Sequence, residues 1–200
     1  MEQAIQLARR ERNPMKLQAT YPTPQHATAA AAITRFFTSN YDIDAVMLVN
    51  SCARGRATRD SCLDINILVQ SDALKAQVKA LEAGWASFDE SDPSIQALKT
   101  AGKYSVVHLD FVDGVFIPSE QDEAAGPDGF ELSVGNLLAY SVPLWQGSDY
   151  LSQLKTSWLP FYNDELRVQR RNHAAYQSHR KRTLQRHQQR GSKPKKRKVS

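Results

Sequence analysis

The chain has 200 residues, 41% of them hydrophobic, and carries a net charge of +5. This length suits one domain of ordinary size with appendages, and the hydrophobic content suffices for a core over the first three quarters. No apolar stretch approaches the ~20 residues of a membrane span, and the Met1–Gln6 stretch is too polar for a secretory signal peptide, so we expect a soluble, cytoplasmic protein.

Two segments precede the first helix that can join a core. Residues 2–13 favour a short polar helix, and residues 17–25, which contain two prolines, favour a linker or an irregular covering segment. A helix is then expected from about Thr28 to Asn40, because its apolar residues recur at core-facing spacing; these are Ile33, Phe36 and Phe37.

Two strands enclose a small polar loop. The apolar run at residues 45–49 predicts the first strand, and Leu63–Val69 predicts the second. Side chains on a strand alternate between its faces, so Asp64 and Asn66 point the same way, ~6.6 Å apart along the strand. The apolar residues between and beside them point into the core.

A helix beginning at Asp72 follows, with apolar residues at intervals of 4, 3, 4 and 3; these are Leu74, Val78, Leu81, Trp85 and Phe88. Asp92-Pro93 is a typical N-cap and N1 pair for a shorter helix that ends at Gly102. Tyr104–Phe111 predicts a third strand, and Asp113-Gly114 predicts a hairpin turn into residues 115–117.

The remaining elements are expected to be helical. Residues 118–129 are acidic and predict a mobile loop, and helices are expected at Glu131–Val142 and Asp149–Leu159, ended by Pro143 and Pro160. The elements together predict a small mixed β-sheet backed by helices, with an all-helical end, in the α/β (α+β) class.

The C-terminal segment differs from the rest in charge. Residues 1–166 hold 13 Lys and Arg and all 21 Asp and Glu, a balance of −8, whereas residues 167–200 hold 13 Lys and Arg and no acid, a balance of +13. Residues 163–190 favour a helix, and the last ten residues are expected to be disordered. The segment predicts salt-sensitive binding of nucleic acid or another polyanion, or alternatively a solubilising or intramolecular role. Lys193–Val199 resembles a nuclear-import signal, so a nuclear location is the alternative if the protein is eukaryotic.

These features divide the chain into four parts. Residues 1–27 form an N-terminal helix and linker, and residues 28–117 form the main domain. Residues 118–166 form an acidic loop and helical extension, and residues 167–200 form a basic helix and tail.

The cysteines and histidines show no metal-binding spacing. Cys52 and Cys62 are the two cysteines, and the five histidines are dispersed, three of them in the basic segment. Two reduced thiols are expected, with a disulfide across the loop as the alternative, and zinc is not indicated.

Asp64 and Asp110 are the candidate metal ligands. His108 and Asp110 share one face of the third strand, so Asp110 can approach Asp64 if the third strand pairs with the second. Two carboxylates ~4 Å apart repel by ~4 kcal/mol at an effective dielectric of 20, so such a pair shares a proton or binds a cation. Oxygen ligands favour Mg²⁺ or Mn²⁺. The alternative is that both are solvent-facing residues of half-exposed strands.

The loop at Asn50–Gly55 is the candidate phosphate site. Ser51 offers a hydroxyl, Arg54 a guanidinium fork, and Gly55 a backbone that a phosphate can approach closely. Asn50 tolerates the left-handed geometry of a tight turn. Arg56 and Arg59 add positive charge or are simply solvated.

Residues 28–117 resemble the minimal nucleotidyltransferases of the DNA polymerase beta superfamily. That family has Gly-Ser, often followed by Ala-Arg-Gly, then Ser-Asp-x-Asp on the next strand and a third Asp on a later strand. Ser51-Cys52-Ala53-Arg54-Gly55 matches the first part, Leu63–Val69 matches the second strand, and Asp110 lies where the third acid is expected.

The acidic motif departs from the family pattern, and two alignments are open. Counted strictly from Ser51, Ser61 matches the family's serine, Cys62 replaces the first Asp and Asp64 is the second. With two inserted residues, Asp64 is the first Asp and Asn66 replaces the second. The strict count needs no insertion, Asp64 is a ligand in both, and Asn50 replaces the family's Gly.

The resemblance implies a metal-dependent nucleotidyltransferase. Asp64 and Asp110 would hold Mg²⁺ or Mn²⁺, and residues 50–55 with Asn66 would bind a nucleoside triphosphate, with ATP as the expected nucleotide. The enzyme would transfer a nucleoside monophosphate to an acceptor hydroxyl that the sequence does not identify.

Two alternatives to this activity remain. One is a catalytically weak or inactive relative that binds a nucleotide or a partner protein, as an antitoxin does. The other is a nucleic-acid-binding protein that acts through residues 167–200.

Overall fold

A four-stranded mixed sheet forms the centre of the fold. The computed structural model describes residues 18–115 and 131–191. The strand order is β3-β2-β1-β4, with bounds β1 (Ala45–Leu48), β2 (Leu63–Leu68), β3 (Val107–Val112) and β4 (Val142–Gln146). β1 pairs antiparallel with both β2 and β4, and β2 pairs parallel with β3. The predicted fold class is therefore confirmed.

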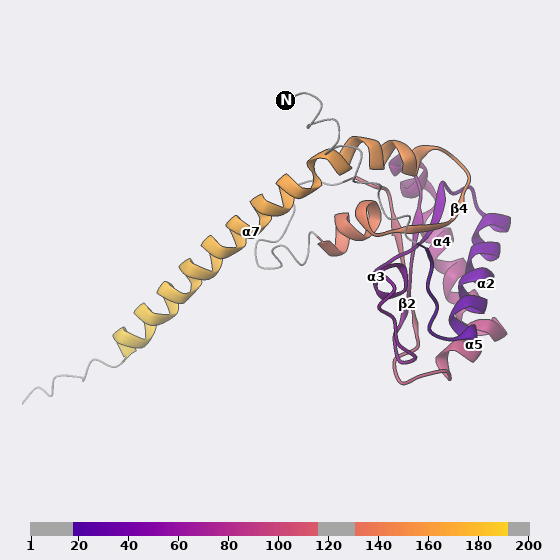
Figure 1. The fold of residues 1–200 in the computed structure, drawn as a ribbon, viewed down its shortest axis with the longest axis horizontal. Coiled ribbons are helices and arrows are strands. Elements are labelled where there is room, and N and C mark those ends of the chain that lie inside the picture. The colour runs from indigo at the N-terminus through magenta and orange to yellow at the C-terminus, as the bar shows by residue number, and fades with distance from the viewer. Residues whose placement is uncertain (1–17, 116–130, 192–200) are drawn as a thin grey trace, which may run out of the picture.

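Three helices cover one face of the sheet, α2 (Pro24–Asn40), α4 (Ser71–Ser91) and α5 (Pro93–Lys99) (Figure 1). The core beneath them contains fully buried side chains from both helices and strands, among them Ile33, Phe37, Ile65, Ile67 and Leu81. The predicted inward face of β2 is confirmed, because Leu63 also belongs to this core.

The opposite face is covered over part of its length by η2 (Glu131–Ala139), a helix with π-type hydrogen bonding, and by the start of α7 (Tyr150–Gly191). A second core lies here and includes Met47, Leu68, Leu137, Leu151 and Tyr162. These helices pack over the Leu68 end of β2, and Asp64 lies toward the other end of the same face.

Capping residues explain where two helices begin. Asp92 caps α5 by accepting hydrogen bonds from the backbone N–H groups of Ser94 and Ile95, as predicted. The segment before Thr28 was expected to be irregular, but α2 begins at Pro24, with Thr23 as its N-cap. Proline is favourable at the first position of a helix, where its missing N–H costs nothing.

The expected helix at Glu131–Val142 was wrong at its C-terminal end. Residues Val142–Gln146 form β4, and Pro143 lies within this strand rather than ending a helix. β4 is an edge strand, and its pairing with β1 is irregular between Val46 and Met47. Edges and bulges are the places where a sheet tolerates proline, because no ladder hydrogen bond is lost.

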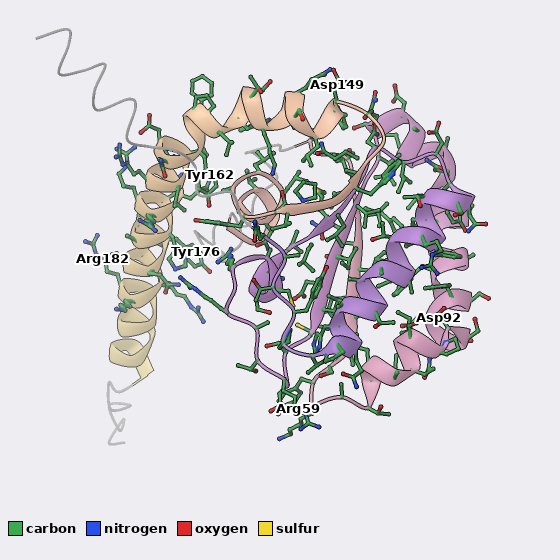
Figure 2. The ribbon with its side chains drawn as sticks, turned by 45° about the vertical axis from the view of Figure 1, so that its right-hand side comes forward. Arg59, Asp92, Asp149, Tyr162, Tyr176 and Arg182 are labelled. Atoms are coloured by element: carbon green, nitrogen blue, oxygen red, sulfur yellow. The ribbon has the colours of Figure 1, made fainter. Side chains whose placement is uncertain are left out.

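The helix expected to end before Pro160 also continues. α7 runs from Tyr150 to Gly191 with Pro160 inside it. Figure 2 shows that the helix runs from Asp149 to the region of Tyr162 and there changes direction toward Tyr176 and Arg182. A proline removes one helical hydrogen bond and kinks a helix, so Pro160 redirects α7 and does not terminate it.

Several sequence predictions lie outside the described residues: the helix at 2–13, the loop at 118–129, Phe116 and Ile117 of the expected hairpin, and the disordered end at 192–200. Gly114 takes the positive φ of 74° that a turn requires, but Val115 is not in a strand. No helix in the described ranges is long and apolar enough to cross a membrane.

Phe37 tests the contribution of the first core to stability. Its ring is fully buried and contacts those of Trp85 and Phe111. We expect Phe37→Ala to lower the free energy of unfolding by about 3–5 kcal/mol, because it removes buried area and leaves a cavity. The measurement is urea denaturation followed by circular dichroism. Phe161→Ala is the matched control, since Phe161 is 64% exposed, and a loss as large as that of Phe37→Ala would contradict this assignment of the core.

Candidate functional site

The turn after β1 has the backbone geometry predicted for it. Asn50 has a positive φ of 53° and begins the short helix α3 (Asn50–Ala53), and Gly55 has a φ of 66°. Asparagine and glycine are the residues that adopt this left-handed conformation most readily. Asn50 therefore performs at this turn the conformational role for which glycine is the usual residue.

Arg54 is held in place by the η2 helix. Its Nη2 donates a hydrogen bond of 3.1 Å to Asn136 Oδ1, and its guanidinium lies 4.1 Å from the centre of the Tyr140 ring. Asn136 Nδ2 in turn donates a 2.7 Å hydrogen bond to Asn50 Oδ1. Asn136 therefore links the left-handed residue of the turn to the arginine that follows it.

Two polar side-chain atoms of this loop are buried without a hydrogen bond to oxygen or nitrogen in the described part of the chain. Arg54 Nε is buried and has no hydrogen-bond partner among the described residues. Ser51 Oγ is likewise buried without an oxygen or nitrogen partner there, although the hydroxyl lies close enough to the Cys52 thiol to lower its pKa. Unpaired buried donors of this kind cost free energy.

The other two loop arginines have different environments. Arg59 Nε donates a 2.8 Å hydrogen bond to the carbonyl of Ala101, and Asp60 Oδ1 accepts one of 2.9 Å from the Lys103 backbone N–H. These bonds attach the loop to the segment before β3. Arg59 therefore has a structural role. Arg56 is exposed and adds positive charge at the surface.

His26 holds the loop from the α2 side. In the neutral ring, Nε2 donates to the carbonyl of Ser61 at 2.9 Å, and Nδ1 accepts from the Thr23 hydroxyl at 2.8 Å. The His26 side chain is fully buried. The N-terminus of α2 thus fixes the backbone immediately before Cys62.

The parallel pairing of β2 with β3 decides which polar residues meet. Asp64 lies opposite His108, and Asn66 lies opposite Asp110. Asp64 and Asn66 are buried, whereas His108 and Asp110 are exposed. Asp110 therefore neighbours Asn66. The residue of β3 that neighbours Asp64 is His108, two positions earlier in the strand.

Three different side chains converge at the start of β2. The Cys62 thiol donates to Asp64 Oδ2 at 3.2 Å, and His108 Nδ1 lies 3.3 Å from Asp64 Oδ1. The three ligand atoms all lie within 4.8 Å of one another. The structure thus brings His108, and not Asp110, beside Asp64. The sharing of a cation by Asp64 and Asp110 stays a prediction.

Both cysteines are free, and their raised pKa values keep the thiols protonated at neutral pH. Burial, and then the neighbouring Asp64 carboxylate, raises the pKa of Cys52 and of Cys62 to about 11. The expectation of reduced cysteines is confirmed. Neither thiol is a ready nucleophile at neutral pH, since the thiolate is the reactive form.

These groups do not match the ligands of Mg²⁺. Magnesium takes near-octahedral oxygen coordination, but of the three converging donors one is a sulfur and one a nitrogen. Asp64 is the one carboxylate of the group. The Mg²⁺ or Mn²⁺ site implied by the family resemblance stays a prediction that rests on Asp64 and Asp110.

Sequence reasoning overlooked four residues of the site. His26, Asn136 and Tyr140 act through tertiary contacts that no local pattern encodes. His108 left a usable signal, because it shares a face with Asp110 and could have been considered in every register of β3 against β2.

No protein-family model and no curated protein matches this sequence. Among solved structures, a crystal structure of a toxin–antitoxin with AMP-PNP is similar, with 13% sequence identity and a TM-score of 0.35. The match covers 74% of this chain and 96% of that chain. A likeness this distant supports no argument about function.

Substitution of Asn50 tests the turn geometry. We expect Asn50→Ala to be less stable than Asn50→Gly by about 1 kcal/mol, because a Cβ is unfavourable at positive φ and glycine has none. Both variants lose the Asn136 hydrogen bond, so their difference isolates the backbone term. The measurement is the free energy of unfolding in urea.

Asn40, at the end of α2, is the matched control for this comparison. There we expect the reverse order, with the glycine variant the less stable, because glycine is unfavourable in a helix. An unchanged order between the two positions would contradict the assigned geometry of Asn50.

Proposed function

We propose that this protein binds a nucleoside triphosphate through the Asn50–Gly55 turn, and that its reaction class is nucleotidyl transfer to an acceptor hydroxyl. The observation that carries the proposal is the position of the buried Asp64 carboxylate directly beside this turn. The Val49 N–H donates a 3.0 Å hydrogen bond to the Asp64 carbonyl, so the end of β1 and the carboxylate-bearing segment of β2 are adjacent.

The turn supplies the phosphate-binding groups. Arg54 offers N–H groups beyond the one that Asn136 engages, and Asn136 and Tyr140 fix its position. A pre-positioned guanidinium binds phosphate with less loss of side-chain entropy than a free one. Gly55 leaves the backbone open where a phosphate would approach.

In the proposed reaction, the acceptor oxygen forms a bond to the α-phosphorus as the bond from that phosphorus to the bridging oxygen breaks. Pyrophosphate leaves, and the hydroxyl proton passes to solvent. Arg54 would stabilise the charge that develops on the leaving group.

A second candidate is a relative that binds the nucleotide, or a partner protein, without efficient transfer. The observation that favours it is the group around Asp64, in which the carboxylate has a thiol and an imidazole as its neighbours and not the expected Asp110. Binding and transfer are therefore measured separately, so that each candidate has its own outcome.

Nucleotide binding is tested with a fluorescent ATP analogue and the full chain. We expect Arg54→Gln to weaken binding about tenfold or more, since a charged hydrogen bond contributes ~1.5–3 kcal/mol. Arg56→Gln, the exposed neighbour, is the matched control and is expected to change binding less than twofold. Equal losses in both variants, with circular dichroism unchanged, would reject Arg54 as the phosphate ligand.

Transfer is tested with NTPs labelled at the α-phosphate, candidate acceptors, and divalent cations. We expect Asp64→Asn to abolish any transfer that the unmodified protein shows, whereas Asp72→Asn, an exposed residue of α4, leaves it unchanged. Transfer that survives Asp64→Asn would place the reacting centre elsewhere. Binding without transfer would select the second candidate.

The basic part of α7 provides a third, independent test. The helix beyond Tyr176 extends away from the sheet (Figure 1), and Arg180, Lys181 and Arg182 are exposed. We expect simultaneous substitution of these three by Gln to weaken binding to a single-stranded oligonucleotide and to reduce the slope of log K against log salt by about 2. An unchanged salt slope would exclude this helix as the polyanion-binding segment.

A further inference from the structure

The group at the start of β2 combines one sulfur, one oxygen and one nitrogen donor. Cys62 Sγ lies 3.2 Å from Asp64 Oδ2, and His108 Nδ1 lies 3.3 Å from Asp64 Oδ1. All three ligand atoms fall within 4.8 Å of one another. Three such atoms of different chemistry are close enough for one ion to bind them together.

The spacing approaches that of tetrahedral coordination. Zinc binds sulfur at about 2.3 Å and nitrogen or oxygen at about 2.0–2.2 Å, so adjacent ligands of a tetrahedral site lie roughly 3.4–3.6 Å apart. The two short separations run to different oxygens of the Asp64 carboxylate, Oδ2 for Cys62 and Oδ1 for His108. With one oxygen as the ligand, the three atoms lie within 4.8 Å of one another, so the side chains would have to rotate and draw closer to reach tetrahedral spacing.

The fold fixes the backbone that carries each donor. Cys62 and Asp64 are two residues apart at the start of β2, and His108 lies opposite Asp64 in β3. The Leu63 N–H donates a 2.9 Å hydrogen bond to the Val106 carbonyl, and His26 binds the carbonyl of Ser61. Both strands are therefore anchored on the flanks of the cluster.

We propose that Cys62, Asp64 and His108 bind a zinc ion, with the fourth coordination position open. Thiolate and imidazole ligands select zinc over the hard cation Mg²⁺. The His108 side chain is 63% exposed, so the open position faces solvent. Three protein ligands with a fourth position for water or substrate characterise zinc sites that act on a ligand rather than only stabilise the fold.

The position of the ion gives it a function at the same site. Asp64 is adjacent to the Asn50–Gly55 turn, so an ion held by these residues would lie near a group bound by that turn. A phosphate oxygen or a water molecule is the ligand that this position would take. The zinc proposal itself does not depend on nucleotide binding, because it is measured in the absence of nucleotide.

Zinc binding is tested by calorimetry on the full chain after chelator treatment and reduction. We expect one zinc per chain, and a weakening of at least about tenfold in Cys62→Ser and in His108→Ala, since even outer-shell partners of a metal contribute ~10–100-fold. Excess Mg²⁺ should not displace the zinc. Absence of zinc binding, or wild-type affinity in both variants, overturns the proposal.

Matched controls separate the cluster from other thiols and imidazoles. Cys52→Ser alters the second, buried thiol, and His179→Ala alters an exposed histidine of α7; both should keep wild-type affinity. Substitution of zinc by Co²⁺ should give a near-ultraviolet thiolate charge-transfer band that Cys62→Ser loses and Cys52→Ser retains. A band that depends on Cys52 would overturn the assignment.

A measurement on the unmodified chain covers the case in which a variant does not fold. The raised pKa of Cys62 makes its thiol slow to react at neutral pH, so alkylation by iodoacetamide is followed over a long incubation at alkaline pH by mass spectrometry. Zinc should protect Cys62 from this reaction, and a chelator should restore it. Alkylation of Cys62 at equal rates with and without zinc refutes its role as a ligand. Fluorescent-nucleotide binding by the zinc-free protein is recorded in parallel, so a failure of one proposal is distinguished from a failure of the other.

Discussion

The parallel register between β2 and β3 is the constraint on which the site depends. It places Asp64 opposite His108 and Asn66 opposite Asp110. The isoleucines of β2 fill the core under α2 and α4, and a shift by one residue would turn them away from the core. The hydrophobic core thus puts polar side chains of both strands on the opposite face, and the register decides that His108, and not Asp110, lies beside Asp64.

The second face of the sheet connects the C-terminal helices to the candidate site. Tyr162 of α7 packs in the core with η2. The contact is close at Gly135 of η2, where a Cβ atom would lie only 2.7 Å from the Tyr162 hydroxyl oxygen. η2 in turn supplies Asn136 to Arg54, and Tyr140, the residue directly after η2, lies against the guanidinium. The position of the guanidinium therefore depends on residues far along the chain, and the loop is not a self-contained motif.

The sequence allowed the elements with strong local signals to be predicted. The period of α4, the Asp92-Pro93 cap and the alternation of β2 are local properties, and the left-handed residue at Asn50 follows from conformational preference. β4 was missed because the short segment containing Pro143 has no strand pattern, and it becomes a strand by pairing with β1. The helix end predicted at Pro160 was wrong because a long helix that packs on both sides of a kink can accommodate proline.

The candidate site was predictable only in part, for a related reason. Asp64 is identified by its place after a small polar loop, but its neighbours are fixed by strand register, which local sequence does not determine. Cys62 and His108 are 46 positions apart in the chain, so no spacing rule for zinc ligands detects them. The topology brings them together.

The Cys62 thiol beside Asp64 affects the electrostatics of this buried carboxylate. Two carboxylates about 4 Å apart would repel by roughly 4 kcal/mol at an effective dielectric of 20, so such a pair shares a proton or binds a cation. With a thiol at this position, the raised pKa of Cys62 keeps it neutral, and its S–H donates to Asp64. Asp64 can then be buried, with an exposed fraction of only 5%, because its neighbours are a thiol and an imidazole and not a second negative charge. The same two neighbours that make the carboxylate stable without a cation are the donors that would distinguish zinc from magnesium.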